Sequence, residues 1–209
     1  MEIDSGTVPH KHIVIGQVGQ VCAGKSSIAD AFRRHGARVY DADKSVHEIY
    51  TRPDVIREVR AMFGPDVLNE KGEVDRKVLG KIVFNDRAKL KRLTSEIIFP
   101  RTGEAVLQAI EAFQKSDAPA LLLDAPSLFE SGRQDVCDII VYVSAPIERR
   151  EQWAQKRGWL PGEIARRESM LENDSEKRKR ADAHIVNDGT LDALEQQAGR
   201  LMRLWTMQA

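Results

Sequence analysis

The stretch GQVCAGKS at residues 19–26 has the spacing G-x-x-x-x-G-K-S, and no other feature constrains the fold of this chain as strongly. Directly before it, residues 12–18 (HIVIGQV) form a short apolar and β-branched run, which is typical of a strand buried on both faces. Residues 25–35 follow with apolar side chains at helical spacing, and Gly36 is placed to end that helix. Strand, glycine-rich loop and helix in this order predict a phosphate-binding loop, or P-loop.

Four further apolar runs predict the remaining strands of one sheet. Each run precedes polar or Gly/Pro residues and then helical sequence, which is the alternation of a doubly wound parallel sheet. The runs lie at residues 37–43, 120–126, 138–146 and 183–189. The length of 209 residues suits one full-sized domain with insertions. We therefore predict a single α/β domain over residues 1–209, built on a five-stranded parallel sheet.

Two segments interrupt this alternation. Residues from about 44 to 117 show helical periodicity and no strand pattern, which predicts a helical insertion. Residues from about 147 to 180 are dense in charge and poor in apolar side chains, and Gly158, Pro161 and Gly162 indicate a bend. We expect this second segment to stay outside the core and to move as a lid, although a charge run of this kind also suits a merely solvated face.

The predicted loop carries the groups that bind the phosphates of a nucleotide. Glycine tolerates the dihedral angles that turn backbone N–H groups inward, where they bind phosphate oxygens together with the helix N-terminus. In such a loop Lys25 bridges the outer phosphates and the Ser26 hydroxyl holds Mg²⁺. The predicted nucleotide-binding residues of the loop are Gly19, Cys22, Ala23, Gly24, Lys25, Ser26 and Ser27.

Cys22 stands in the loop at a position where small, unreactive residues are more usual. We interpret it as a small space-filling side chain. The alternative is a redox role. We predict that the thiol is accessible in the empty protein and shielded when nucleotide binds, because the residue belongs to the loop that closes round the phosphates.

Three aspartates at predicted strand ends are candidates for chemistry beyond phosphate binding. A kinase of small molecules needs a group that receives the proton of the acceptor hydroxyl. Asp41 and Asp43 end the second predicted strand, so either can face the acceptor while the other caps the following helix. Asp124 ends the third strand, where it is either a metal-water ligand or a plain turn residue. Ser26 and Asp124 are the predicted metal-site residues.

Composition argues against several classes of protein. Lysine plus arginine total 32 and aspartate plus glutamate total 32, so no overall basic field marks a nucleic-acid binder. Two cysteines are too few for a disulfide framework. The first twelve residues lack the apolar run of a secretory signal, and no later run reaches the roughly 18 apolar residues of a membrane span. We expect a cytoplasmic protein.

Four segments in one order and spacing are more specific than the loop alone: VGQVCAGKSS, VYDADKSVHEIY, LLLDAPSLFESG and ADAHIVNDGT. In this combination the chain resembles dephospho-CoA kinases from about residue 12 to about residue 205. The resemblance implies that ATP, with Mg²⁺, phosphorylates the 3′-hydroxyl of dephospho-CoA, the last step of coenzyme A synthesis. It also implies that Asp43 is the base, that the 44–117 insertion binds the acceptor, and that the strand end around Asn187 lies near the adenine.

Five positions depart from the pattern that is usual in that family. Val18 stands where threonine is common, and Phe99 replaces the histidine of a His-Pro pair. Gln152 takes the place of a lid arginine, Leu171 that of a glutamine, and Ser127 that of a leucine. These changes bear on efficient catalysis more than on nucleotide binding.

Other cations can supply the lid charge that is missing at Gln152. Four lie within a turn or two of it on a predicted helix: Arg149, Arg150, Lys156 and Arg157. Arg157, just before the Gly158 bend, is predicted to contact phosphate and to act in catalysis with Lys25 and Asp43.

The leading hypothesis is an ATP:dephospho-CoA 3′-phosphotransferase. Phe99 and Ser127 leave open a kinase of the same architecture that acts on another hydroxyl acceptor. A third hypothesis is a non-catalytic nucleotide- or CoA-binding protein, and the retention of Lys25 and Asp43 argues against it. A GTPase is disfavoured because the sequence has no N/T-K-x-D base-reading segment after a strand.

Overall fold

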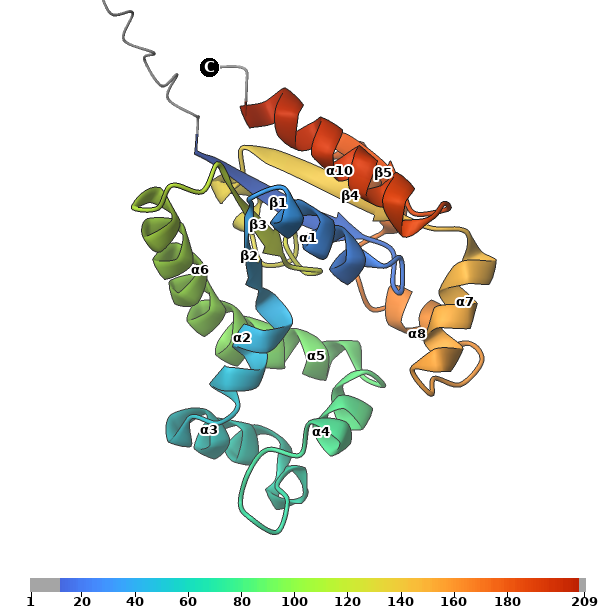
Figure 1. The fold of residues 1–209 in the computed structure, drawn as a ribbon. Helices are drawn as coiled ribbons and strands as arrows, with labels where there is room; N and C mark the ends of the chain where they lie inside the picture. The colour runs from blue at the N-terminus through green and yellow to red at the C-terminus, as the bar shows by residue number, and fades with distance from the viewer. Residues whose placement is uncertain (1–11, 207–209) are drawn as a thin grey trace, which may run out of the picture.

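The computed structural model describes residues 12–206, which form a five-stranded sheet in the order β2-β3-β1-β4-β5. All five predicted strands are present and every neighbouring pair runs parallel (Figure 1), so the predicted α/β fold is confirmed. The strands are β1 Ile13–Gly19, β2 Arg38–Asp41, β3 Ala120–Asp124, β4 Ile139–Ser144 and β5 Ala183–Val186.

The central strand delivers the P-loop to the carboxyl edge of the sheet. All seven residues of β1 are buried, because helices cover both faces of the sheet. Gly19 closes β1 opposite Val143 of β4, and a Cβ at Gly19 would lie 2.1 Å from the Val143 carbonyl oxygen. Only glycine permits this approach, which sets the start of the loop directly against the sheet.

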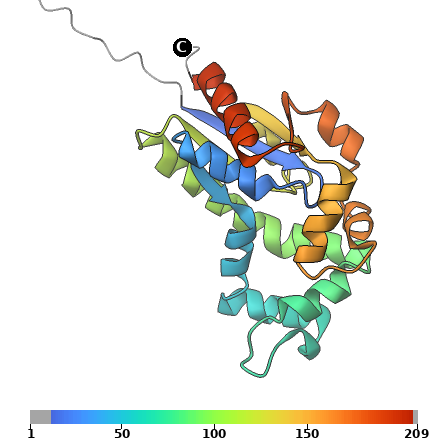
Figure 2. The ribbon, with the colours of Figure 1, turned by 45° about the vertical axis from the view of Figure 1, so that its right-hand side comes forward.

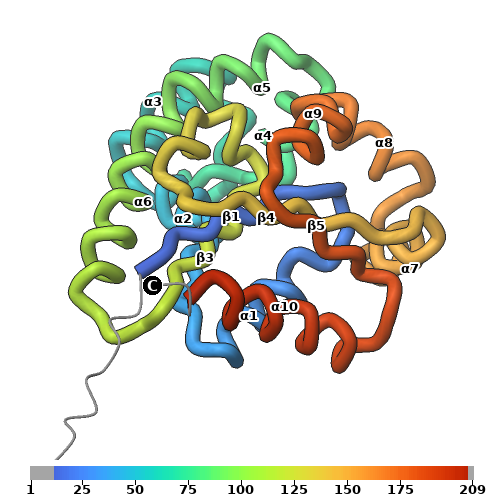
Figure 3. The backbone as a smooth tube through the Cα atoms, turned by 90° about the horizontal axis from the view of Figure 1, so that it is seen from above, coloured from blue at the N-terminus to red at the C-terminus, as the bar shows by residue number. Residues whose placement is uncertain are grey.

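Helices cover the two faces of the sheet as a doubly wound fold requires. On one face α1 (Lys25–Arg34) and α10 (Leu191–Thr206) pack against the strands and form the main apolar core. On the other face α6 (Phe99–Gln114) contributes Val106 and Phe113, which contact β1 and β3. Figure 3 shows α1 and α10 on one side of the strands and α6 on the other.

Between β2 and β3 the chain is mainly helical and extends away from the sheet (Figures 1 and 2). Its helices bury their apolar faces against one another, and they form a second core around Val55, Val59 and Leu79. One isolated antiparallel bridge joins Leu68 to Val74. The elements of this part are α2 Ala42–Ile49, α3 Pro53–Phe63, η1 Pro65–Val67, α4 Arg76–Val83, α5 Arg87–Leu93, η2 Thr94–Ile98 and α6.

The helix that runs from α5 into α6 widens to a π-helix at η2. Pro100 follows η2 closely and has no N–H to donate to the carbonyl of Glu96, four residues earlier. The wider turn accommodates this missing hydrogen bond. Such widened turns are frequent at functional sites, and this one directly precedes Phe99.

The charged segment at residues 147–180 is more firmly packed than its composition predicts. Ala154 and Ile164 pack against Cys22 of the P-loop, and the side chains of Arg150 and Lys177 are buried. The expectation that this segment stays outside the packed interior is therefore wrong. Its charged side chains can be buried because each forms an ion pair, Arg150 with Glu168 and Lys177 with Glu130. Its helices are α7 Ile147–Lys156, α8 Glu163–Glu168 and α9 Asp174–Lys179.

The remaining short element is η3 (Arg133–Val136), which lies between β3 and β4. Within residues 12–206, the helices are all too short or too polar to cross a membrane.

Candidate active site

The P-loop turn joins β1 to α1. Gly24 precedes the helix in a left-handed conformation with φ 82°. Cys22 has φ 59° and is the one non-glycine residue with positive φ among residues 12–206, a conformation that costs on the order of 1 kcal/mol. No side chain of the described residues caps α1, and the Ser27 N–H already donates to the Gly24 carbonyl at 3.0 Å, so the N–H groups of Lys25 and Ser26 are the ones of the first turn that remain for an anion. The turn therefore has the construction of a phosphate site.

Lys25 is folded back into this loop. Its Nζ donates to the Gln20 carbonyl at 2.8 Å and to the Gly19 carbonyl at 3.4 Å. Burial lowers the pKa of the Lys25 ammonium, while the carboxylates of Asp124 and Asp43 act in the opposite direction. The ammonium group is thus bonded to the loop carbonyls and is acted on by the charges of two carboxylates.

The structure separates two aspartates that the sequence left equivalent. β2 ends at Asp41, whose Oδ1 accepts from the Lys44 N–H at 2.9 Å and so caps α2. Asp43 lies in the first turn of α2. The prediction that both aspartates end the second strand is therefore wrong for Asp43, because α2 begins between them.

Asp43 faces charges from several parts of the molecule. Its side chain is exposed, but protein surrounds it at longer range, and this desolvation raises the pKa of its carboxyl. Asp41 raises the pKa further, while Lys25, Arg76 at the start of α4 and Arg167 in α8 oppose the rise. A carboxylate that is open to solvent and has a raised pKa suits proton transfer.

Asp124 closes β3 opposite Gln17 of β1. Burial raises the pKa of the Asp124 carboxyl, and the Gln17 amide and Lys25 oppose that rise. Its Oδ1 is buried and has no hydrogen-bond partner among the described residues, which fits a hydrated cation. Residues 12–206 contain no cluster of three His, Cys, Asp or Glu side chains that could hold a metal unaided. A cation bound here would therefore also need oxygens from the nucleotide and a further side chain, for which the exposed Ser26 in the first turn of α1 is the predicted donor.

Asn187 directly follows β5 and contacts the backbone of the P-loop. Its buried side chain donates from Nδ2 to the Ala23 carbonyl at 3.0 Å. A Cβ at Gly24 would approach the same Nδ2 to 2.3 Å, so glycine is required there. The amide that was expected near the adenine is thus engaged with the loop backbone. Next to it, Arg149 of α7 donates to the Gly189 carbonyl at 2.7 Å.

Cys22 and Arg157 meet beside the loop. The Cys22 side chain is 7% exposed, which agrees with a space-filling role and disagrees with an exposed thiol. Arg157 follows α7 and places Nη1 3.9 Å from Cys22 Sγ. The residue predicted for phosphate contact therefore does lie at the P-loop.

Three residues near the loop escaped the sequence analysis. Arg167 lies over the Trp159 ring at 4.0 Å, and Lys177 donates from its buried Nζ to Glu130 at 2.9 Å. Both belong to a charge run without periodicity; Trp159 is a signal for Arg167, and Lys177 has none in the sequence. Gln17 is fully buried in β1 and donates to the Lys25 carbonyl. A polar residue inside an otherwise apolar strand was its signal.

The departures from the family pattern lie in four kinds of surroundings. Val18 is fully buried in the sheet, and Phe99 packs against the second core. Gln152 is exposed on α7, whereas Ser127 and Leu171 are half-buried. None of the five lies in the P-loop turn itself.

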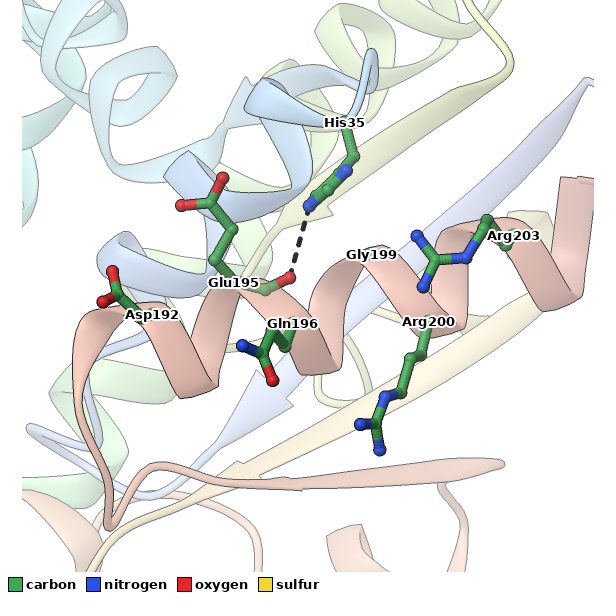
Figure 4. A pocket seen from close by; sticks show the side chains of 7 residues that line it. All are labelled: His35, Asp192, Glu195, Gln196, Gly199, Arg200 and Arg203. Atoms are coloured by element: carbon green, nitrogen blue, oxygen red, sulfur yellow. Dashed lines mark hydrogen bonds between the residues drawn. The ribbon is translucent and has the colours of Figure 1, made fainter.

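A surface hollow of about 570 Å³ lies between the end of α1 and α10. Figure 4 shows His35 pointing at α10, where its Nε2 is 3.2 Å from the Glu195 carbonyl oxygen. A Cβ at Gly199 would come within 2.7 Å of the His35 ring, so glycine lets the ring lie against the helix. None of the predicted site residues lines this hollow. Its lining consists of His35, which follows α1, and residues of α10.

Comparison with known proteins identifies relatives of this chain. The model of the family described as dephospho-CoA kinase matches residues 13–193. A relative of that name from Geobacillus kaustophilus is 35% identical over 92% of this chain and 96% of its own length. Another from Aquifex aeolicus is 37% identical over 90% of this chain and 94% of its own length.

Solved structures agree in fold. A protein from Thermus thermophilus is 29% identical and has a TM-score of 0.77, covering 94% of this chain and 99% of that one. A dephospho-CoA kinase from Campylobacter jejuni is 20% identical with a TM-score of 0.66, covering 93% and 97%, and it shows the fold alone. With the family model and these relatives matching nearly its whole length, the chain belongs to the dephospho-CoA kinase family.

Proposed function

We propose that the protein transfers the γ-phosphoryl group of ATP to the 3′-hydroxyl of dephospho-CoA and so forms coenzyme A. The observation that carries this proposal is a P-loop turn whose Lys25 is folded back onto the loop carbonyls, where the charges of Asp43 and Asp124 both act on it. Membership of the family supports the identity of the acceptor.

The nucleotide phosphates would lie in the concave side of the loop. The N–H groups of the α1 first turn and the left-handed Gly24 favour phosphate oxygens there. Lys25 would exchange its bonds to the Gly19 and Gln20 carbonyls for bonds to the outer phosphates. Cys22, Ala23 and Ser27 would contribute through the backbone.

Ser26 and Asp124 would hold Mg²⁺, the former through its hydroxyl and the latter through bound water. The buried, unpartnered Oδ1 of Asp124 supports this role among the described residues. When bound, the ion neutralises phosphate charge during transfer.

Asp43 would receive the proton of the acceptor hydroxyl on a carboxylate oxygen. The O–H bond breaks, the acceptor oxygen bonds to the γ-phosphorus, and the bond from that phosphorus to the leaving ADP oxygen breaks. Arg157 beside the loop and Arg167 opposite Asp43 would balance the negative charge on the transferred group.

The two helical segments divide the substrates between them. The 44–117 insertion would hold the acceptor, and it carries Arg76, whose charge acts on Asp43. The 147–180 segment would cover the nucleotide as a lid. Both would belong to one kinase domain over residues 1–209. This function suits a cytoplasmic enzyme with a small-molecule substrate and no nucleic-acid partner.

Formation of coenzyme A from ATP and dephospho-CoA tests the proposal directly. Asp43→Asn keeps the shape of the side chain and loses the base, so turnover should fall by about two to four orders of magnitude with little change in ATP affinity. Asp41→Asn is the matched control, because asparagine caps a helix as well as aspartate does. An Asp43→Asn enzyme with wild-type turnover would remove Asp43 from the mechanism.

Nucleotide binding has its own test. Lys25→Ala removes a charge from the outer phosphates and should weaken ATP binding in calorimetry. The control is Lys44→Ala, at an exposed position of α2. Equal ATP affinity in wild type and Lys25→Ala would contradict the phosphate-loop assignment.

A different hydroxyl acceptor is the second candidate, favoured by Phe99 and Ser127 at positions where the family differs. Wild-type protein that binds ATP but forms no coenzyme A would give it precedence.

A further inference from the structure

Successive residues of the P-loop are held by helices of the 147–180 segment. Gln20 donates from Nε2 to Asp174 at the start of α9, at 3.1 Å. Cys22 packs against Ala154 of α7. Val21, between them, is held by charged side chains of α7 and α8. Figure 1 shows α7 and α8 at the end of the sheet where this loop emerges.

Both backbone polar groups of Val21 bond to one ion pair. The Val21 N–H donates to Glu168 Oε1 at 3.2 Å, and Arg150 Nη1 donates to the Val21 carbonyl at 3.1 Å. Arg150 Nη1 also donates to the same Glu168 oxygen at 2.5 Å. The Arg150 side chain is buried. Charge-assisted bonds therefore form a closed ring around Val21, and such bonds hold geometry more tightly than neutral ones do.

Other contacts hold the residues on either side of Val21: the Gln20 N–H donates to the Val143 carbonyl at 3.0 Å, and Asn187 Nδ2 donates to the Ala23 carbonyl at 3.0 Å. Cys22 is kept at positive φ, which a free turn containing that residue would avoid. The N–H groups that follow must nevertheless keep their directions, because phosphate recognition depends on donors placed in advance. A contact that holds Val21 from outside supplies this constraint.

We propose that Arg150 and Glu168 are positioning residues that fix the P-loop turn at Val21, so that the 147–180 segment shapes the phosphate site as well as covering it. The effect on catalysis rests on the proposed function, whereas the link between loop and segment does not. Neither side chain needs to touch substrate, because each acts through the Val21 backbone.

Cys22 provides a direct probe of this link. Its thiol is shielded by α7 and α8, so alkylation followed by mass spectrometry reports how often the loop and the segment separate. Cys137 is an internal reference for general loosening, because it is half-buried in the cluster around Leu128 and Ile140, which contains no residue of the 147–180 segment, and burial raises the pKa of its thiol to about 12. The variants are Glu168→Gln and Arg150→Gln. The control is Lys179→Gln, which breaks an exposed ion pair on α9.

Cys22 should react about tenfold faster in Glu168→Gln and Arg150→Gln, with Cys137 unchanged and Lys179→Gln like wild type. The KM for ATP should rise about five- to tenfold while kcat falls less than about threefold, because the loss concerns ground-state phosphate binding.

Unchanged Cys22 labelling in both variants would overturn the proposal, and so would equal acceleration at Cys22 and Cys137, which indicates general loosening. If Arg150→Gln does not fold, Glu168→Gln decides, since it keeps its volume and an oxygen that accepts from Val21. If wild type forms no coenzyme A, the proposed function fails, and Cys22 labelling with ATP calorimetry still judges the positioning role.

Discussion

The two helical segments beside the P-loop are held in opposite ways. The part between β2 and β3 has its own core of nine buried apolar residues. The 147–180 segment buries two apolar residues, Ala154 and Ile164, yet it also buries the charged side chains of Arg150 and Lys177. Apolar burial therefore stabilises the first segment, and paired charges fix the second.

This difference suits what each segment contacts. Apolar packing is non-directional and tolerates small displacements, so it fits a body that adjusts to an acceptor. Buried ion pairs are directional, and breaking one leaves an uncompensated charge. We infer that the acceptor side can adapt while the phosphate side stays fixed.

The largest loss of stability is expected from a cavity in the apolar core of the part between β2 and β3. Leu79 in α4 is 2% exposed, and Leu79→Ala should lower the free energy of unfolding by about 3 kcal/mol through lost burial and a cavity. Denaturant titration measures this. Leu107→Ala, at a residue of α6 that is 60% exposed, should cost less than about 0.5 kcal/mol. Equal losses in both variants would show that the second core contributes little to stability.

In the 147–180 segment, stability should depend on the volume of the side chain at position 177 as well as on its charge. Lys177 is 2% exposed and pairs with Glu130, whose side chain is 24% exposed. Lys177→Ala leaves that carboxylate unpaired beside a void and should cost about 2 kcal/mol, whereas Lys177→Met fills the space and should cost less than about 1 kcal/mol. Thermal and denaturant unfolding compare the two. A methionine variant as unstable as the alanine variant would mean that the ion pair itself is strongly stabilising.

The sheet and the P-loop could be predicted from the sequence because strands buried on both faces leave short apolar runs. The runs at 12–18 and 120–126 correspond closely to β1 and β3. The run at 37–43 was extended too far, since Asp41 both ends β2 and caps α2. A strand template cannot detect a helix that starts within it.

The packing of the 147–180 segment could not be predicted in the same way. Arg150 bonds to the carbonyl of Val21, which is 129 positions away in the chain, and no spacing rule encodes that contact. In sequence, a buried paired charge is indistinguishable from a solvated one. Asp43 was selected by resemblance alone, and the cap at Asp41 is what distinguishes the two aspartates physically.

The smallest expected effect on stability concerns Asp124, a half-buried carboxylate that belongs to neither segment. Burial raises the pKa of its carboxyl in the folded protein above the ordinary value of 3.8. Between those two values the folded state binds more protons than the unfolded state, so stability falls as pH rises through that window. At neutral pH the ionised carboxylate therefore costs stability, although Lys25 offsets part of the cost.

Asp124→Asn should accordingly be more stable than wild type at pH 7 in a chelator, where no cation compensates the carboxylate, and the difference should vanish below about pH 3.8. Asp188→Asn removes an exposed carboxylate and controls for the change in net charge. Phosphoryl transfer should fall in the Asp124 variant even though its stability rises, because the proposed Mg²⁺ contact is lost. Urea titrations at the two pH values measure the sign. A less stable Asp124→Asn protein at pH 7 would mean that attraction to Lys25 outweighs burial, and that this charge, like those of the 147–180 segment, holds the loop in place.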